Sequence, residues 1–238
     1  VTHTGAPQFN KSPTDFHPST LGHNDELLPY HKTTEFGSDY YDVDHLTPHM
    51  RLGLKQWGDW LTDTVGYQAY RFDLTQRIEP WYVWEWMHYG PMRGSFAVAE
   101  YWALADGREQ QEWIDLTGHS VAVFDWNLQK MLKDMCEGNG SFDMKRLDHP
   151  SLLGLDPDYT VTFVESHDTY APMKTLEEQG ILLGKDLAYG YTLFQPSMTM
   201  VYYHDYYLQP YHDGTPDPAE PERGLPSGYF GTPLKSWI

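Results

Sequence analysis

Cysteine, basic residues and long apolar runs are what this sequence has least of. Cys136 is the only cysteine among 238 residues, so no disulfide can form within the chain and the redox compartment stays open. No stretch approaches the ~18 consecutive apolar residues that a membrane-spanning helix needs. The first residues, Val1–Gly5, have neither a basic start nor an apolar run, so they do not resemble a signal peptide.

The shortage of positive charge narrows the class of partner. The sequence has 16 basic and 34 acidic residues, which gives a formal net charge of −18 and a pI near 4.8. Such a chain is repelled by nucleic acid and by anionic membranes, so we expect neither as a partner. Neutral substrates and bound cations are favoured instead. The 16% of aromatic residues more often signals core packing, although flat aromatic rings also stack on sugars.

A glycine-rich phosphate loop is also missing, although strands and helices alternate as in a parallel α/β protein. The pattern predicts five apolar strands, at residues 66–73, 95–102, 119–126, 159–166 and 198–203. Helices are predicted from Pro48 to about Thr64, and at 80–90, 109–116, about 127–136 and 185–194. An open doubly wound sheet and a (β/α)8 barrel both fit this alternation, but acidic strand ends favour the barrel, whose active site lies on that face.

Three of these strands end in a carboxylate, namely Asp73, Glu100 and Asp168. A buried strand seldom ends in an acid unless the acid is used, and carboxyl ends of parallel strands meet at one edge. A retaining glycosidase needs two carboxyl groups roughly 5–5.5 Å apart, one ionised and one protonated. Taken singly, each acid is more simply a local ion pair, a turn or a helix cap. Taken together and in order, they predict glycoside hydrolysis.

The flanking residues make the prediction specific. The strand ends read Gly-Tyr-Gln-Ala-Tyr-Arg-Phe-Asp at 66–73, Ala-Glu-Tyr-Trp at 99–102, Val-Phe-Asp at 123–125, Phe-Val-Glu-Ser-His-Asp-Thr at 163–169 and Met-Val-Tyr-Tyr-His-Asp at 200–205. In order and spacing they resemble the α-amylase family, glycoside hydrolase family 13, and most of all its archaeal and liquefying-type bacterial members. The resemblance implies strands 4–8 of a (β/α)8 TIM barrel over 46–238, with a proline-rich loop at 210–238. Residues 1–45 would be part of an inserted, loop-rich B domain.

The resemblance also implies roles for individual residues. Asp73 would be the nucleophile, Glu100 the general acid/base, and Asp168 would hold sugar hydroxyls and stabilise the transition state. Arg71 points to the same side of its strand as Asp73, where its guanidinium would keep that carboxylate ionised and oriented. An apolar wall around Glu100 would raise its pKa, as an acid catalyst requires. Further substrate contacts are predicted at the following positions: His167, Gln76, Tyr101 and Trp102.

Acids that alternate in Asp39-Tyr-Tyr-Asp42-Val-Asp44 suit calcium, which prefers oxygen ligands. The resemblance implies a structural Ca²⁺ held by Asp42 and by the backbone carbonyl of Arg77, with Asp39 a weaker candidate. The alternative is a solvated acidic loop. Five nearby histidines have no regular zinc spacing, so we interpret them as surface residues.

Departures from the family pattern leave the product and the reaction partly open. Gln76 and Arg77 stand where the family often has Lys-His, Ser166 replaces an asparagine, and Ala99 replaces a glycine. The leading hypothesis is endo-acting, retaining hydrolysis of α-1,4 bonds in a starch-like glucan by a protein of which this is a partial chain. The alternatives are a glucan transferase on the same scaffold and a non-catalytic glucan-binding fragment. By resemblance the protein would be secreted, and the isolated 238 residues would be inactive.

Overall fold

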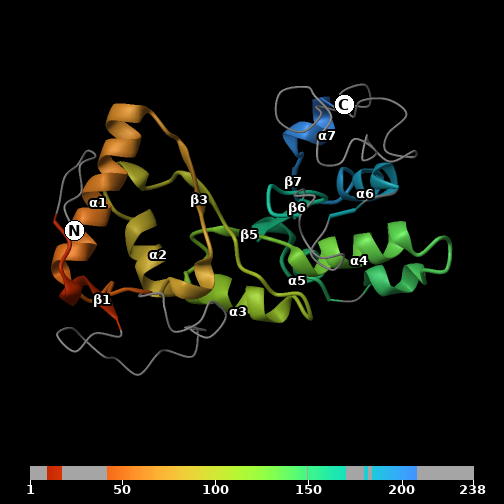
Figure 1. The fold of residues 1–238 in the computed structure, drawn as a ribbon, viewed down its shortest axis with the longest axis horizontal. Coiled ribbons are helices and arrows are strands. Elements are labelled where there is room, and N and C mark those ends of the chain that lie inside the picture. Colours follow the sequence, from red (N-terminus) through yellow and green to blue (C-terminus); the bar gives the residue numbers. More distant parts are fainter. Residues whose placement is uncertain (1–9, 18–41, 149, 170–179, 182–183, 208–238) are drawn as a thin grey trace, which may run out of the picture. The chain divides into compact units, whose positions relative to one another are not determined.

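The computed structural model describes residues 10–17, 42–148, 150–169, 180–181 and 184–207. The chain forms two compact units, and each is described by itself (Figure 1). The first unit comprises Val1–Trp102 and Glu112–Val123, and the second comprises Ala103–Gln111 and Phe124–Ile238. No helix in the described part of the chain is both long and apolar enough to cross a membrane.

The main sheet has five strands that follow one another in chain order: β3 (Ala69–Phe72), β4 (Phe96–Ala99), β5 (Ala122–Phe124), β6 (Thr160–Phe163) and β7 (Met198–Met200). The pairs β3–β4, β4–β5 and β6–β7 are parallel. The five predicted strands and the parallel sheet are therefore confirmed. A doubly wound sheet reverses its strand order at a switch point. This sheet has no such reversal, which is the order expected of consecutive barrel strands.

In the first unit, two helices lie side by side next to β3 (Figure 1). They are α1 (Pro48–Asp59), which continues as the π-helical segment η2 (Trp60–Val65), and α2 (Pro80–Met87). Trp86 of α2 donates its indole N–H to the carbonyl of Leu54 at 3.1 Å and receives the rings of Tyr70 and Phe72 edge-on. Because side chains alternate along a strand, this packing leaves Arg71 on the opposite face of β3.

The helical segment that precedes β3 ends where the sequence predicts. Gly66 adopts φ = +90°, the left-handed conformation that glycine enters without steric cost, and it closes η2. The strand then begins at Ala69 and runs only to Phe72, so Asp73 lies just past the strand end. Both the helix end and the strand agree with the sequence pattern.

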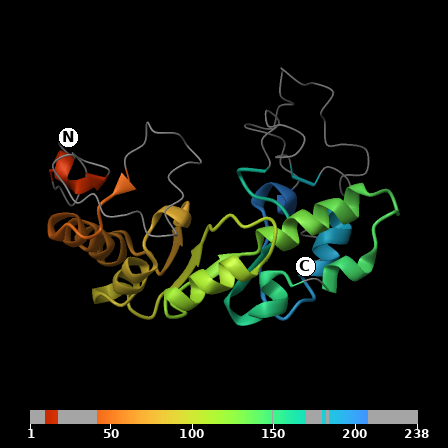
Figure 2. The same ribbon diagram turned by 90° about the horizontal axis from the view of Figure 1, so that it is seen from below.

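In the second unit, the fully buried strand β6 packs with α4 (Trp126–Glu137) and α6 (Lys185–Thr192). These two helices, green and blue in Figure 2, also contact each other. Asp125 caps α4 by accepting from the N–H of Leu128 at 2.9 Å, and it also accepts from the N–H of Leu153 at 2.8 Å. Burial raises the pKa of Asp125 above its ordinary value of 3.8, although these N–H donors oppose the shift. The strand-end acid of the Val-Phe-Asp motif is therefore a structural cap.

The remaining elements refine the predictions. Helix α3 (Arg108–Leu116) lies where it is expected, and the short helix α7 (Tyr203–Tyr207) begins at the end of the predicted last strand. The connection between α4 and β6 contains short helical segments, which bury Leu147, Leu152 and Leu153. These segments are η5 (Met144–Asp148), α5 (Leu152–Leu155) and η6 (Pro157–Tyr159), and the first unit also contains η3 (Thr75–Arg77) and η4 (Gly90–Met92).

Little of the predicted B-domain segment is described. It contains η1 (Pro13–Asp15) and two short strands, β1 (Phe16–His17) and β2 (Asp42–Val43), which pair antiparallel. The rest of residues 1–45, Asp39 included, and the proline-rich segment 210–238 lie outside the described residues. The predicted domain boundary at residue 45 therefore stays a prediction.

Candidate active site

Two of the three predicted catalytic acids meet at one arginine. The Arg71 guanidinium contacts Asp73 through Nη1, with 2.6 Å to Oδ1, and Glu100 through Nη2, with 2.9 Å to Oε2. The Asp73 side chain is 75% exposed, that of Arg71 is 37% exposed, and that of Glu100 is only 5% exposed. One carboxylate therefore faces solvent and the other is buried, with a shared cation between them.

The parallel register brings these residues together. Phe72 lies opposite Ala99, and the N–H of Glu100 continues the pairing by donating to the carbonyl of Phe72 at 2.9 Å. Because Asp73 and Glu100 are each the next residue along, both leave the sheet at the same point. The sequence spacing alone suffices to predict this meeting, since both acids follow parallel strands.

The turn after Asp73 is shaped around Glu100. Leu74 has φ = +46°, a left-handed conformation that is uncommon for a residue other than glycine. In this conformation its N–H donates to Oε2 of Glu100 at 3.2 Å. The N–H and hydroxyl of Thr75 both donate to the Glu100 carbonyl, at 2.9 and 2.8 Å. Strained backbone of this kind concentrates at functional sites, and here it fixes the buried carboxyl group.

A cavity of about 630 Å³ opens beside this pair. Arg71, Asp73 and Leu74 form part of its lining, while most of the remainder is aromatic or aliphatic and includes Trp57 and Tyr67. Apolar walls with a few convergent charged groups are typical of small-molecule sites. The exposed acid of the pair therefore faces a space that a sugar ring could enter.

The third predicted acid lies in the second unit. Asp168 and His167 occupy the turn that follows β6, and Nε2 of His167 lies 3.3 Å from Oδ2 of Asp168. The His167 side chain is exposed and that of Asp168 is half-buried. These two residues are thus a contacting pair at a strand end, as the sequence predicts, and their relation to Asp73 and Glu100 stays a prediction.

The other predicted substrate contacts hold the fold around the site. Gln76 is buried and donates from Nε2 to the carbonyl of Trp102 at 3.1 Å, so it ties η3 to the segment after Glu100. The ring of Tyr101 is buried against Trp113, at 5.7 Å between ring centroids. Trp102 is half-buried. A sugar platform needs an accessible ring face, and of the two aromatic residues only Trp102 is partly exposed.

Comparisons with known proteins agree with this geometry. No protein-family model matches the chain. The chain is 31% identical over 177 residues to a glucan 1,4-alpha-maltohexaosidase of Bacillus sp. (strain 707), 73% of this chain and 34% of that protein. It is 30% identical to the alpha-amylase of Geobacillus stearothermophilus over 180 residues, 73% of this chain and 32% of the relative. It is also 30% identical to the alpha-amylase of Bacillus licheniformis over 172 residues, 71% and 33% of the two chains.

Over about 70% of its length the chain is similar to members of the α-amylase family. It spans about a third of the length of these relatives. The family resemblance noted from the strand-end motifs is therefore confirmed, and the matched length agrees with the interpretation of a partial chain.

The calcium site that the α-amylase resemblance implies has one partial structural correlate. Val43, directly after Asp42, and Arg77 line the same cavity in the first unit. The side chain of Asp42 lies outside what is described, and no group of three or more His, Cys, Asp or Glu side chains in the described residues could hold a metal. A carboxylate and a backbone carbonyl are both oxygen donors, so the chemistry of the predicted pair fits Ca²⁺.

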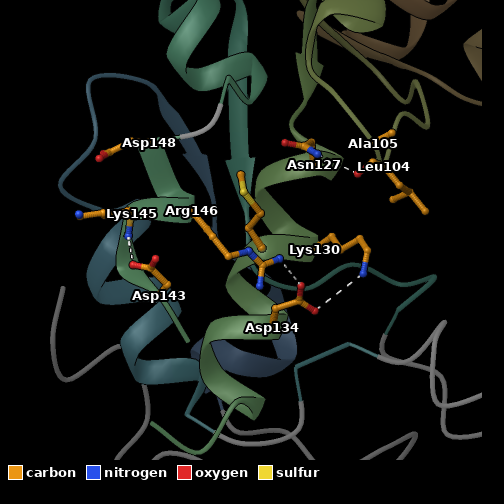
Figure 3. Close-up of a pocket in the computed structure, with 10 residues that line it drawn as sticks. Leu104, Ala105, Asn127, Lys130, Asp134, Asp143, Lys145, Arg146 and Asp148 are labelled. Atoms are coloured by element: carbon orange, nitrogen blue, oxygen red, sulfur yellow. Dashed lines mark hydrogen bonds and ion pairs between the residues drawn. The ribbon is translucent and has the colours of Figure 1, made fainter. Parts of the chain in front are cut away.

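A second cavity, of about 570 Å³, lies in the second unit (Figure 3). Charged side chains of both signs line it, and several pair with one another. Asp134 forms ion pairs with Arg146, at 2.8 Å between Oδ2 and Nη2, and with Lys130, at 3.8 Å between Oδ1 and Nζ. With its charges so paired, this cavity shows no preference for a cation or an anion, and it has no aromatic ring for a sugar. We therefore assign this cavity no role.

Sequence patterns missed one charged residue of the second unit. Lys185 begins α6 and is almost fully buried, with its ammonium group between Glu165 and Asp205. A lysine at the first position of a helix normally reaches solvent, so sequence gives no reason to expect burial. The one available signal is Glu165, an acid in the middle of an apolar strand end.

Proposed function

We propose that the whole protein hydrolyses α-1,4-glucosidic bonds in starch-like glucans, cutting within the chain and retaining the anomeric configuration. The observation that carries the proposal is the contact of a single guanidinium, that of Arg71, with both Asp73 and Glu100. Retaining glycosidases require two such closely spaced carboxyl groups. The relatives' names, which include glucan 1,4-alpha-maltohexaosidase and alpha-amylase, support an α-glucan as substrate.

In the proposed reaction, the Asp73 carboxylate attacks the anomeric carbon while the bond from that carbon to the leaving sugar oxygen breaks. Glu100 gives its proton to that oxygen, and a glycosyl ester of Asp73 forms. In the second half, Glu100 takes a proton from water, whose oxygen attacks the same carbon and releases Asp73. Arg71 orients Asp73 throughout, because its guanidinium holds the carboxylate by a short charge-assisted hydrogen bond.

The rest of the proposal concerns groups beyond this pair. We propose that the sheet is strands 4–8 of a (β/α)8 barrel, which would bring Asp168 and His167 to the same face as Asp73. There they would hold sugar hydroxyls, and Trp102 would also contact the sugar. Secretion of the protein, which the resemblance implies, stays a prediction.

A direct test compares starch hydrolysis by the full-length protein with that of its Asp73→Asn variant. We expect kcat to fall by about 10⁴-fold or more, the scale on which loss of a covalent nucleophile acts in other enzymes. Asp63→Asn is the matched control, because Asp63 is an exposed aspartate of the same unit that lies outside the site. Unchanged activity in Asp73→Asn would overturn the proposal. Product lengths from a maltooligosaccharide would separate hydrolysis from glucan transfer.

We also propose that Ca²⁺ binds at Asp42 and the Arg77 carbonyl and has a structural role. Since the ion would bind the folded state, it would stabilise that state by about 2.7 kcal/mol when its free concentration is 100-fold above Kd. We expect EDTA to lower the melting temperature and added Ca²⁺ to restore it, whereas Asp42→Asn should abolish the response. An identical response in Asp42→Asn would refute this site.

A further inference from the structure

A buried charged cluster joins three elements of the second unit. The Lys185 ammonium group lies 2.7 Å from Oε2 of Glu165 and 2.9 Å from Oδ1 of Asp205. Tyr189, one turn further along α6, donates its hydroxyl to Oδ2 of Asp205 at 2.8 Å. All four side chains are almost fully buried. The segment that follows β6 and the short helix α7 are thus tied through the carboxylates of Glu165 and Asp205 to the first turn of α6.

Glu165 also accepts hydrogen bonds from the residues on either side of the His167–Asp168 pair. Its Oε1 accepts from the N–H of Ser166, which comes before the pair, at 3.2 Å. The same oxygen accepts from the hydroxyl of Thr169, which comes after the pair. The Ser166 hydroxyl closes the turn by accepting from the N–H of Asp168 at 3.2 Å. A movement of the Glu165 carboxylate would therefore move the backbone on either side of Asp168.

We propose that Lys185 and Glu165 are positioning residues, which fix the turn that presents His167 and Asp168 to the substrate. This inference rests on the proposed function, since it assigns Asp168 a role in sugar binding and in the transition state. Neither Lys185 nor Glu165 would touch the sugar. Lys185 holds the carboxylate of Glu165, and Glu165 in turn holds the two ends of the turn.

The charges explain why the cluster needs its lysine. Two carboxyl groups and one ammonium group face one another, and Tyr189 completes the hydrogen bonding of Asp205. Burial raises the pKa of Glu165 above its ordinary value of 4.5, and Lys185 opposes that shift. Burial and the nearby Asp205 raise the pKa of Tyr189 as well. Without Lys185, Glu165 and Asp205 would have to share a proton, as closely spaced carboxyl groups do.

Close packing holds the Glu165 carboxylate from the other side. The N–H of Gly180 donates to the carbonyl of Thr169 at 2.8 Å. A Cβ atom at Gly180 would lie only 2.2 Å from Oε2 of Glu165, closer than real contacts allow. Glycine is required there because any side chain would push the carboxylate out of place. Gly180→Ala therefore displaces Glu165 without changing any charge.

The test compares starch hydrolysis by the full-length wild-type protein with that of Lys185→Met and of the double variant Lys185→Met, Glu165→Gln. For Lys185→Met at neutral pH we expect kcat to fall about 10- to 100-fold, since a misplacement of ~1 Å can cost about 100-fold, and KM to rise. Activity should return at acid pH, because the two carboxyl groups then hold their shared proton, and fall as pH rises through the pKa of the pair. This fall in activity with rising pH is the alkaline limb of the Lys185→Met profile. The double variant retains only one of the two carboxyl groups and should lose the alkaline limb.

Lys130→Met is the matched control, because Lys130 is an exposed lysine of the same unit that pairs with Asp134. Circular dichroism at each pH identifies the conditions in which every variant is folded, and partial unfolding would lower the apparent kcat without raising KM. A Lys185→Met variant with the pH profile and KM of Lys130→Met would overturn the positioning role. So would a double variant that keeps the alkaline limb.

If Lys185→Met does not fold, Gly180→Ala decides the question. We expect it to lower kcat and raise KM without adding an alkaline limb, whereas wild-type kinetics would overturn the inference. Asp73→Asn separates the two proposals. If it stays active, the proposed function fails; if it is inactive while Lys185→Met behaves like wild type, only the positioning role fails. A wild-type protein without starch hydrolysis would refute both.

Discussion

The two units solve the same electrostatic problem in opposite surroundings. In each, a single cation lies between two carboxyl groups that follow parallel strands, Arg71 in the first unit and Lys185 in the second. In the first unit the Asp73 side chain is 75% exposed and that of Glu100 is only 5% exposed, whereas in the second unit neither Glu165 nor Asp205 exceeds 3%. Because the charges are arranged alike in both units, their arrangement does not distinguish the roles of the carboxylates. The solvent exposure of each carboxylate does distinguish them.

Solvent exposure distinguishes a carboxylate that can react with a substrate from one that can only position neighbouring groups. Asp73 lines a cavity and its side chain is 75% exposed, so it is available as a nucleophile. The Glu165 side chain is only 3% exposed and is held by Lys185, by the N–H of Ser166 and by the hydroxyl of Thr169. The cost of removing a cation should differ accordingly, because water replaces a lost surface partner and cannot replace a buried one.

The largest effect that sharpens this comparison is expected at the buried acid of the first unit. Glu100→Gln should lower kcat on starch by about 10²- to 10⁴-fold, the usual contribution of a general acid. An aryl glycoside with a nitrophenolate leaving group needs no proton, so its first step should be largely preserved. Glu112→Gln, at an exposed glutamate, is the control. Equal losses on both substrates would show that Glu100 is not the acid.

The next comparison sets the two cations against each other in stability. Lys185→Met leaves two buried carboxyl groups without their cation and should lower the free energy of unfolding by about 3–5 kcal/mol. Arg71→Met removes a cation whose side chain is 37% exposed and whose partner Asp73 is 75% exposed, but it also leaves the buried Glu100 without that cation. It should therefore cost more than the ~0–1 kcal/mol of a surface pair and less than Lys185→Met. Urea titration of both variants measures this difference. Similar losses in the two variants would contradict the distinction between the sites.

A smaller effect reports how tightly the second unit is closed. Cys136 donates its thiol to the carbonyl of Gly184, the residue before Lys185, at 3.2 Å. Burial raises the pKa of this thiol from 9.0 to about 11, so at pH 8 iodoacetamide should modify it about 100-fold more slowly than an unperturbed thiol. Mass spectrometry follows the rate, with the unfolded protein as reference. Equal rates in the native and unfolded states would contradict a closed second unit.

Sequence reasoning predicted the elements better than the environments. Apolar runs and helical spacing located β3 to β7 and α1 to within a few residues, because these patterns depend on local chain geometry. The spacing of Asp73 and Glu100 also predicted their meeting, since parallel strands end at one edge. The burial of Tyr101 and Gln76 could not be predicted, because it depends on Trp113 and on the carbonyl of Trp102. The burial of Lys185 likewise depends on Glu165 and Asp205, which lie 20 residues away from it in sequence on either side.

The anomer released first from a maltooligosaccharide tests the central claim most directly. Attack by Asp73 inverts the anomeric carbon once and attack by water inverts it again, so the product should keep the substrate configuration. Proton NMR during the first minutes, before mutarotation, distinguishes the two anomers. We predict that the α anomer of the full-length protein's product appears first. Initial release of the β anomer would contradict a covalent role for Asp73 and, with it, the proposed use of the Arg71 pair.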